Sequence, residues 1–329
     1  MKTNIIFSLI TFAFLINLNA QQEPLKWYTL KEAIELNKKQ PRKLMIDMYT
    51  DWCGWCKKMD AETFHHPAIA AFIRDNFYPV KFNAETHDTI EYKGKKYTNN
   101  GMGQRPPHSL AVELMNNKMS YPTIVYLDED LNLLSSVPGY MNAADIEPVL
   151  VFFARNFYKI YPYENFKHDF DKTFKDSTVF QDKVHWKSFE EGLKSNKKKL
   201  IYFAHPGCID CKMMQKTSFQ HDSIAKYLNQ HFTCIHFDIL SQDTIEFNGK
   251  KYFFDQKQYP FHQLAVMLSN GQINLPQIIF LNEQNQIVSS VPGFFPVKNF
   301  DILIHFFNEE AFKTLTWENY IKQYKSNIP

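Results

Sequence analysis

The chain has 329 residues, of which 44% are hydrophobic and 16% aromatic, including 30 phenylalanines. This length and composition predict two domains with ordinary packed cores. The formal net charge of +2 argues against a nucleic-acid-binding protein, because such proteins carry a concentrated basic surface. We therefore expect no nucleic-acid partner.

The first twenty residues, MKTNIIFSLITFAFLINLNA, have the pattern of a cleaved signal peptide. Lys2 supplies a positive charge, an apolar run follows over 5–16, and Ala20 is a small residue at the expected cleavage site. The run is shorter than the roughly 20 residues of a membrane-spanning helix. We expect residues 1–20 to be removed, leaving a soluble periplasmic or secreted protein. An uncleaved anchor is the alternative.

The first half of the remaining chain alternates between helix and strand patterns. The run Lys43 to Tyr49 is short, continuous and apolar apart from one aspartate, which is typical of a buried strand. This alternation predicts an α/β domain with helices packed on a central sheet. In chain order we expect a helix over 30–37, a strand over 43–49, helices over 56–64 and 67–76, a strand over 78–83, a hairpin around Gly94, a helix over 109–115, strands over 123–127 and 133–137, and a closing helix over 145–158.

The second half repeats the first. Cys208 and Cys211 lie 155 positions after Cys53 and Cys56, and a register of 155 and then 154 positions continues through both halves. Matched segments include DTIE at 88–91 and 243–246, GKKY at 94–97 and 249–252, and SSVPG at 135–139 and 289–293. A register held for this long predicts a duplicated domain rather than a short solenoid repeat. We place the domains at 21–172 and 183–329, joined by the polar segment between them.

The first copy carries two closely spaced cysteines, Cys53 and Cys56, between a strand and a helix in DMYTDWCGWCKKMDAETF. This spacing lets a disulfide open and close without backbone rearrangement. Cys53 would lie at the helix N-terminus, where unpaired N–H groups and the helix dipole favour the thiolate and lower its pKa. The pattern therefore predicts that Cys53 attacks a disulfide and that Cys56 resolves the mixed disulfide.

Asp47 and Pro122 complete the site predicted in the first copy. A carboxylate within a buried strand is costly unless it has a partner or a role, and burial would raise its pKa and suit it to accept a proton from Cys56. Pro122 directly precedes a β-branched run, which fits a strand start or a cis turn beside the cysteines. The alternatives are that Asp47 hydrogen-bonds a neighbouring loop and that Pro122 only opens a strand.

Taken together, these motifs resemble the thioredoxin superfamily, and more closely the thioredoxin-like proteins related to the C-terminal periplasmic domain of the disulfide reductase DsbD. The resemblance implies two tandem thioredoxin-like domains, each a central mixed β-sheet flanked by helices. It implies that Pro122 is a cis-proline and that Trp52 belongs to the site. The Gly-Trp dipeptide between the cysteines and a long segment over 86–120 depart from the family pattern. The matching motifs are Asp47-Met48-Tyr49, Asp51-Trp52-Cys53, Cys56-Lys57, Thr63-Phe64 and Tyr121-Pro122-Thr123.

The second copy keeps the pair Cys208 and Cys211, and the proline at Pro276, but changes their surroundings. Tyr202 stands where Asp47 stood, so the proton acceptor is missing. Asp210 places a negative charge between the cysteines, which opposes thiolate formation. We expect a slower or differently poised second site. The fifth cysteine, Cys234, lies in a strand pattern and is either a buried thiol or a third redox cysteine.

The sequence favours an exported thiol:disulfide oxidoreductase that reduces protein disulfides at Cys53 and Cys56. It would use no cofactor beyond its own redox-active disulfides, Cys53–Cys56 and Cys208–Cys211. Because exported proteins meet an oxidising compartment, it would need an electron donor, either a membrane reductase or another thioredoxin-like protein. Two alternatives remain open: a thioredoxin-fold binding or chaperone module, and a carrier that holds a metal on its thiolates.

Overall fold

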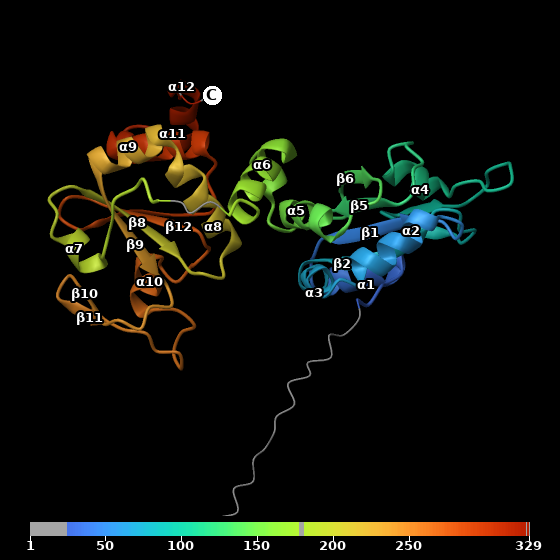
Figure 1. The fold of residues 1–329 in the computed structure, drawn as a ribbon, viewed down its shortest axis with the longest axis horizontal. Coiled ribbons are helices and arrows are strands. Elements are labelled where there is room, and N and C mark those ends of the chain that lie inside the picture. Colours follow the sequence, from blue (N-terminus) through green and yellow to red (C-terminus); the bar gives the residue numbers. More distant parts are fainter. Residues whose placement is uncertain (1–24, 178–180, 327, 329) are drawn as a thin grey trace, which may run out of the picture. The chain divides into compact units, whose positions relative to one another are not determined.

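The computed structural model describes residues 25–177, 181–326 and 328, which form two compact units that divide between Arg155 and Asn156 (Figure 1). The predicted signal peptide lies outside the described residues. Within them, no helix is long and apolar enough to cross a membrane.

The first unit contains the predicted elements in the predicted order. Thr29 begins the first helix with a capping box, in which its side chain and that of Glu32 each accept a backbone N–H. The elements are α1 (Leu30–Lys39), β1 (Leu44–Tyr49), α2 (Gly54–Met59), the π-helix η1 (Asp60–Phe64), α3 (Pro67–Asn76), β2 (Tyr78–Asn83), β3 (Ile90–Tyr92), β4 (Lys95–Tyr97), α4 (Ser109–Leu114), β5 (Thr123–Leu127), β6 (Leu133–Pro138) and α5 (Ala143–Ala154).

The four-stranded sheet of the first unit has the order β2-β1-β5-β6 and is mixed. Strand β1 is central: it pairs in parallel with β2 and antiparallel with β5, which pairs antiparallel with β6. The short hairpin of β3 and β4 forms a separate two-stranded sheet. The sheet thus places Asp47 of β1 directly between Lys81 of β2 and Ile124 of β5.

Helices cover both faces of this sheet. Ile46 and Met48 of β1 share one core with residues of α1 and α4. On the opposite face, Tyr126 of β5 stacks on Phe153 of α5, with ring centroids 4.2 Å apart. Because successive side chains of a strand alternate between faces, Asp47 does not point into the core that contains Ile46 and Met48.

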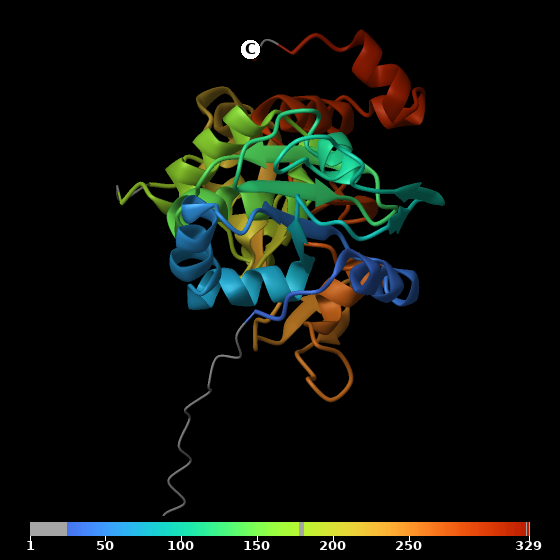
Figure 2. The same cartoon turned by 90° about the vertical axis from the view of Figure 1, so that its right-hand side faces the viewer.

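The second unit repeats these elements. Its five-stranded sheet has the order β13-β12-β8-β9-β7, and the hairpin of β10 and β11 forms a separate two-stranded sheet (Figure 1 and Figure 2). Ile245 and Phe247 of this hairpin are buried in the core that contains Ile201 of β8. The elements are η2 (Phe157–Lys159), α6 (Tyr163–Phe174), β7 (Trp186–Lys187), α7 (Phe189–Leu193), β8 (Lys198–Ala204), α8 (Ile209–Lys216), η3 (Ser218–Gln220), α9 (Asp222–His231), β9 (Phe232–Asp238), β10 (Ile245–Phe247), β11 (Lys250–Tyr252), α10 (Gln263–Leu268), β12 (Gln277–Leu281), β13 (Ile287–Pro292), α11 (Val297–Asn308), η4 (Ala311–Lys313) and α12 (Trp317–Gln323).

Two boundaries differ from the sequence expectation. The closing helix of the first copy ends at Ala154 rather than at Tyr158, because Asn156 adopts a left-handed conformation with φ of 61° and a separate 3₁₀ turn follows. The compact units also divide earlier in the chain than the segment 172–182, where the sequence repeat ends. The reason is that α6 packs against α8 of the second unit.

Candidate active site

The first cysteine pair lies at the start of α2. Cys53 is the N-cap residue of this helix, and its Sγ accepts a hydrogen bond from the backbone N–H of Cys56 at 3.0 Å. The two cysteines form a disulfide with a Cα–Cα distance of 5.3 Å. Cys53 is 4% exposed and Cys56 is 5% exposed, so only a small part of the disulfide is accessible to solvent. A sulfur at the N-cap lies at the positive end of the helix dipole. This position favours the thiolate form of Cys53 once the disulfide is reduced.

Asp47 lies in the buried centre of the sheet and is 1% exposed. Its Oδ2 accepts a hydrogen bond from Lys81 Nζ at 2.7 Å, and the same ammonium donates to Asp60 Oδ1 at 2.9 Å. Asp60 directly follows α2, so Lys81 connects the carboxylate in the sheet to the end of the active-site helix. Within the described part of the chain, Asp47 Oδ1 is buried and has no hydrogen-bond partner.

Burial raises the pKa of Asp47, and the opposing attraction of Lys81 does not cancel this effect. Burial alone would lower the pKa of Lys81, but Asp47 and Asp60 raise it above its usual value. Lys81 therefore stays charged at neutral pH. Asp47 combines a raised pKa with a free oxygen, and such a carboxylate can take up and release a proton.

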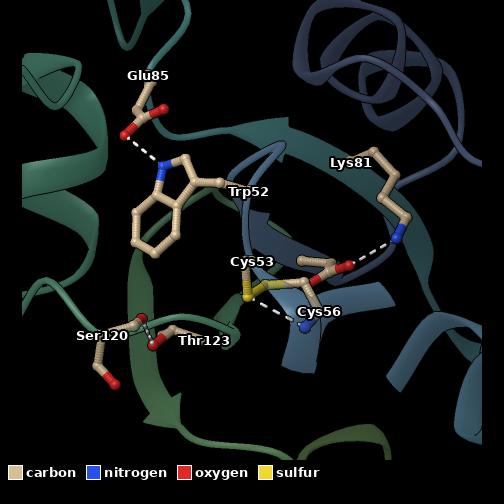
Figure 3. Close-up of a disulfide and its surroundings, with 8 residues drawn as sticks. Trp52, Cys53, Cys56, Lys81, Glu85, Ser120 and Thr123 are labelled. Carbon is tan, nitrogen blue, oxygen red and sulfur yellow. Dashed lines mark hydrogen bonds and ion pairs between the residues drawn. A yellow bond between two sulfur atoms is a disulfide. The ribbon is translucent and has the colours of Figure 1, made fainter. Parts of the chain in front are cut away.

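The peptide bond between Tyr121 and Pro122 is cis, as the family resemblance implies. Thr123, which follows the proline, donates from Oγ1 to the carbonyl oxygen of Ser120 at 2.6 Å. In Figure 3 the loop that contains Ser120 and Thr123 lies beside the disulfide. The structure thus brings the predicted proline segment next to the predicted cysteines.

Trp52 is half exposed and is held by three neighbours. Its Nε1 donates to Glu85 Oε1 at 2.9 Å (Figure 3). Its ring meets the Tyr121 ring edge-on, with centroids 6.1 Å apart, and the Arg105 guanidinium lies 5.5 Å from the Trp52 ring centroid. Trp55, which is 58% exposed, packs on Tyr140 at 5.4 Å. Aromatic side chains thus line the surface around the first disulfide.

The second cysteine pair repeats the backbone geometry of the first. Cys208 is the N-cap residue of α8, and its Sγ accepts from the Cys211 N–H at 3.1 Å. The two cysteines form a disulfide with a Cα–Cα distance of 5.2 Å. The bond between Leu275 and Pro276 is cis.

The ionisable network beneath the first disulfide is replaced in the second unit. Tyr202 occupies the position of Asp47 and is opposite His236 in the sheet, as Asp47 is opposite Lys81. Tyr202 is fully buried, and its hydroxyl donates to the carbonyl oxygen of Cys211 at 2.9 Å. Burial raises the pKa of Tyr202, so its hydroxyl remains neutral. The hydroxyl therefore acts as a hydrogen-bond donor to the backbone of α8.

Cys234 lies on β9 and is buried. Burial raises the pKa of its thiol to about 12, so Cys234 is protonated at neutral pH. This environment suits a buried apolar thiol and opposes a nucleophilic role. Among the described residues, no group of three or more histidine, cysteine, aspartate or glutamate side chains is arranged to hold a metal ion.

Sequence reasoning missed Lys81, Asp60, Glu85 and Arg105. A signal for Lys81 and Asp60 was present in the repeat, because His236 and Gln215 stand at the matched positions of the second copy. The second copy therefore lacks the counterpart of the Asp47 carboxylate and the counterparts of both its charged neighbours.

The two units have the architecture of a thioredoxin-like fold: a mixed sheet covered on both faces by helices, a disulfide at a helix N-terminus, and a cis-proline before a neighbouring strand. The family model described as a thioredoxin-like domain matches residues 30–154 and again 187–308. The chain therefore belongs to the thioredoxin-like domain family.

Individual relatives are more distant. The chain is 40% identical over 45 residues to the thiol:disulfide interchange protein DsbD of Vibrio vulnificus, a match that covers 14% of this chain and 8% of that protein. Among solved structures, it is similar to the C-terminal domain of Neisseria meningitidis DsbD in the reduced form, at 18% identity over 38% of this chain and 93% of the other, with a TM-score of 0.26. A thioredoxin from Thermus thermophilus is 17% identical over 39% of this chain and 85% of its own, with a TM-score of 0.30.

Proposed function

We propose that the protein is an exported thiol:disulfide oxidoreductase that reduces disulfides of periplasmic or secreted proteins through Cys53 and Cys56. The observation that carries this proposal is the pairing of a helix-capping cysteine with a buried carboxylate that keeps one oxygen unpartnered. The name of the curated relative, a thiol:disulfide interchange protein, supports the same reaction class.

The reaction begins from the reduced pair. The Cys53 thiolate attacks one sulfur of the target disulfide, which forms a mixed disulfide and releases the first target thiolate. Asp47 accepts the proton of the Cys56 thiol, and the resulting Cys56 thiolate attacks Cys53 Sγ. This step closes the Cys53–Cys56 disulfide and releases the second target thiolate. The target gains two electrons, and the protein loses two.

Net reduction therefore requires an electron donor to reopen the Cys53–Cys56 disulfide. We propose a membrane reductase or another thioredoxin-like protein for this role. The direction of flux depends on the reduction potential of the pair. A value near the roughly −270 mV of a reducing thioredoxin fits a reductase, whereas one near the roughly −120 mV of a strong oxidant fits a disulfide donor.

Trapping of the mixed disulfide tests the proposal. With Cys56→Ser, the resolving thiol is absent, and we expect Cys53 to accumulate covalently bound protein substrate, detected as a thiol-sensitive mass increase. Cys53→Ser should trap nothing, because the attacking sulfur is lost. Equal trapping by the two variants would contradict the assigned order of attack.

The exposed tryptophans near the first disulfide favour one alternative, a module that binds unfolded chains without redox chemistry. Trp52 and Trp55 are each more than half exposed, at 52% and 58%. Suppression of the aggregation of an unfolded protein separates the two functions. A binding module would keep this property in the double variant Cys53→Ser/Cys56→Ser, whereas reduction of insulin disulfides would be lost.

A further inference from the structure

The surfaces beside the two disulfides differ far more than the disulfides themselves. Cys53 and Cys208 are similarly accessible, at 4% and 6% exposed. Two positions after these cysteines, Trp55 of the first unit is 58% exposed, whereas Asp210 of the second unit is 8% exposed. At a further matched position, Tyr140 is only partly buried, whereas Phe294 is 6% exposed. Something in the second unit covers the surface that the first unit leaves open.

The covering element is the segment of residues 157–174, which contains η2 and α6 and is called the cover segment below. Helix α6 packs against α8, the helix that Cys208 begins (Figure 1). At one end of the cover segment, the rings of Phe157 and Tyr161 contact Phe294, with centroids 5.2 and 6.0 Å away. At its other end, Lys216 of α8 donates from Nζ to the carbonyl oxygen of Thr173 at 3.0 Å.

The interior of the cover segment is aromatic, so it has a packed structure of its own. Phe166 lies between Phe157 and Phe170, with centroids 4.7 and 5.8 Å from these rings. All three side chains are at most 2% exposed. The cover segment is therefore a packed part of the second unit rather than an extended linker.

A protein substrate and a small thiol make different demands on this surface. A folded protein must lay part of its own surface against the residues around the attacked sulfur, and even small interfaces cover hundreds of square ångströms. A low-molecular-weight thiol needs only an open line of approach to the sulfur. The cover segment occupies the surface around Cys208 that a folded protein would need to contact. It leaves the Cys208 residue itself as accessible as Cys53.

We propose that the second disulfide, Cys208–Cys211, exchanges with low-molecular-weight thiols and that the cover segment excludes proteins from it. The proposal rests on the proposed function in that both pairs are taken to be redox-active. A small thiolate attacks Cys208 Sγ, forms a mixed disulfide and releases the Cys211 thiolate. A second small thiolate then releases Cys208 and forms the small disulfide, so two thiols lose two electrons and the Cys208–Cys211 pair gains them.

The test compares both disulfides within one full-length chain. The oxidised protein is treated with dithiothreitol, as the small probe, or with a reduced thioredoxin, as the protein probe. Free thiols are alkylated at time points and assigned to each cysteine pair by mass spectrometry. For each pair, the rate constant with thioredoxin is divided by that with dithiothreitol, which removes most of the difference in intrinsic reactivity between the pairs.

We expect this ratio to be at least tenfold smaller for Cys208–Cys211 than for Cys53–Cys56. Loosening the cover segment with Tyr161→Ala or Lys216→Met should raise the ratio for the second pair several-fold and leave that of the first pair unchanged. Lys212→Met is the matched control, because Lys212 is an exposed lysine on the same helix and its side chain makes no hydrogen bond to the described residues, the cover segment included. Lys216→Met removes the hydrogen bond to the carbonyl oxygen of Thr173 without deleting a core side chain, so it provides the test if Tyr161→Ala fails to fold.

Equal ratios for the two pairs in the unsubstituted chain would overturn the proposal, as would variants that leave the second ratio unchanged. Failure of the proposed function gives a different result. In that case the first pair would be inert towards thioredoxin although its surface is open, whatever the behaviour of the second pair.

Discussion

At the scale of single residues, Asp47 is the point where two electrostatic effects oppose each other. Removal from water disfavours its charged form, whereas the Lys81 ammonium at 2.7 Å favours it. The pKa is raised, so burial is the stronger effect. The folded protein therefore loses stability as the pH rises from the usual pKa of a carboxyl group, about 3.9, through the raised value.

Asp47→Asn should consequently have opposite effects on stability and catalysis. At pH 7 we expect a higher free energy of unfolding than in the unsubstituted protein, because the buried charge is gone. Below about pH 3.9 the two proteins should converge, since Asp47 is then protonated in both the folded and the unfolded state. Denaturant unfolding at several pH values measures this. Lower stability of the variant at pH 7 would mean that the ion pair with Lys81 outweighs burial.

The same substitution should slow the resolution of the mixed disulfide by about 10²-fold, the lower end of what general acid–base catalysis contributes. The cause is loss of the proton acceptor for Cys56. Stopped-flow reduction of a peptide disulfide by the reduced protein separates attack from resolution. A slowed first step with a normal second step would assign Asp47 to Cys53 instead.

At the scale of secondary-structure elements, each unit contains a long segment that a buried histidine holds in place. This segment joins β2 to α4 in the first unit and β9 to α10 in the second. His108 and His262 are each fully buried and begin these helices. Each Nδ1 accepts a backbone N–H, from Leu110 at 3.2 Å and from Leu264 at 3.1 Å. Each Nε2 lies within hydrogen-bond distance of a carbonyl oxygen, 3.1 Å from that of Asp88 and 2.9 Å from that of Asp243. The segment that departs from the minimal family pattern is thus tied to the core in both units.

This arrangement predicts a loss of stability in mild acid. Burial lowers the pKa of both histidines, so the unfolded chain binds protons more readily than the folded one. Stability should be full above the usual histidine pKa of about 6.5 and should fall as the pH drops below it.

His108→Gln and His262→Gln should each flatten this decline and should lower the free energy of unfolding at pH 8 by about 1–2 kcal/mol through lost buried hydrogen bonds. His66→Gln, at an exposed histidine, is the control. An unchanged pH profile in both variants would place the titration elsewhere.

At the scale of the whole molecule, a duplication has produced two units with the same backbone chemistry and different surroundings. The first keeps Asp47, Lys81 and an open aromatic surface. The second has Tyr202 beneath its disulfide and α6 packed against its active-site helix. We infer a division of labour in which the first unit acts on proteins.

Removal of each pair tests this division. In an insulin reduction assay with dithiothreitol as donor, Cys208→Ser/Cys211→Ser should retain at least half of the activity. The variant Cys53→Ser/Cys56→Ser should retain less than about one tenth, because the second unit lacks both the proton acceptor and an open surface. Similar losses in the two variants would show that both pairs act on protein substrates.

The sequence alone determined the duplication, nearly every helix and strand of the first unit, and the two cysteine pairs at helix starts. It also identified Asp47 as a carboxylate in a buried strand. These features depend on the local spacing of residues and on the period of apolar residues, and both can be read directly from the sequence. The cis geometry of Pro122 was implied by the family resemblance rather than by these local patterns.

Only the tertiary structure decided what surrounds the cysteines. Lys81 reaches Asp47 because β1 and β2 pair in one register, and Glu85 reaches Trp52 from a segment 33 residues away. The packing of α6 on α8 joined the end of the first sequence repeat to the second unit. Each of these contacts depends on which residues distant in sequence the folded chain brings together, and no local pattern encodes that choice.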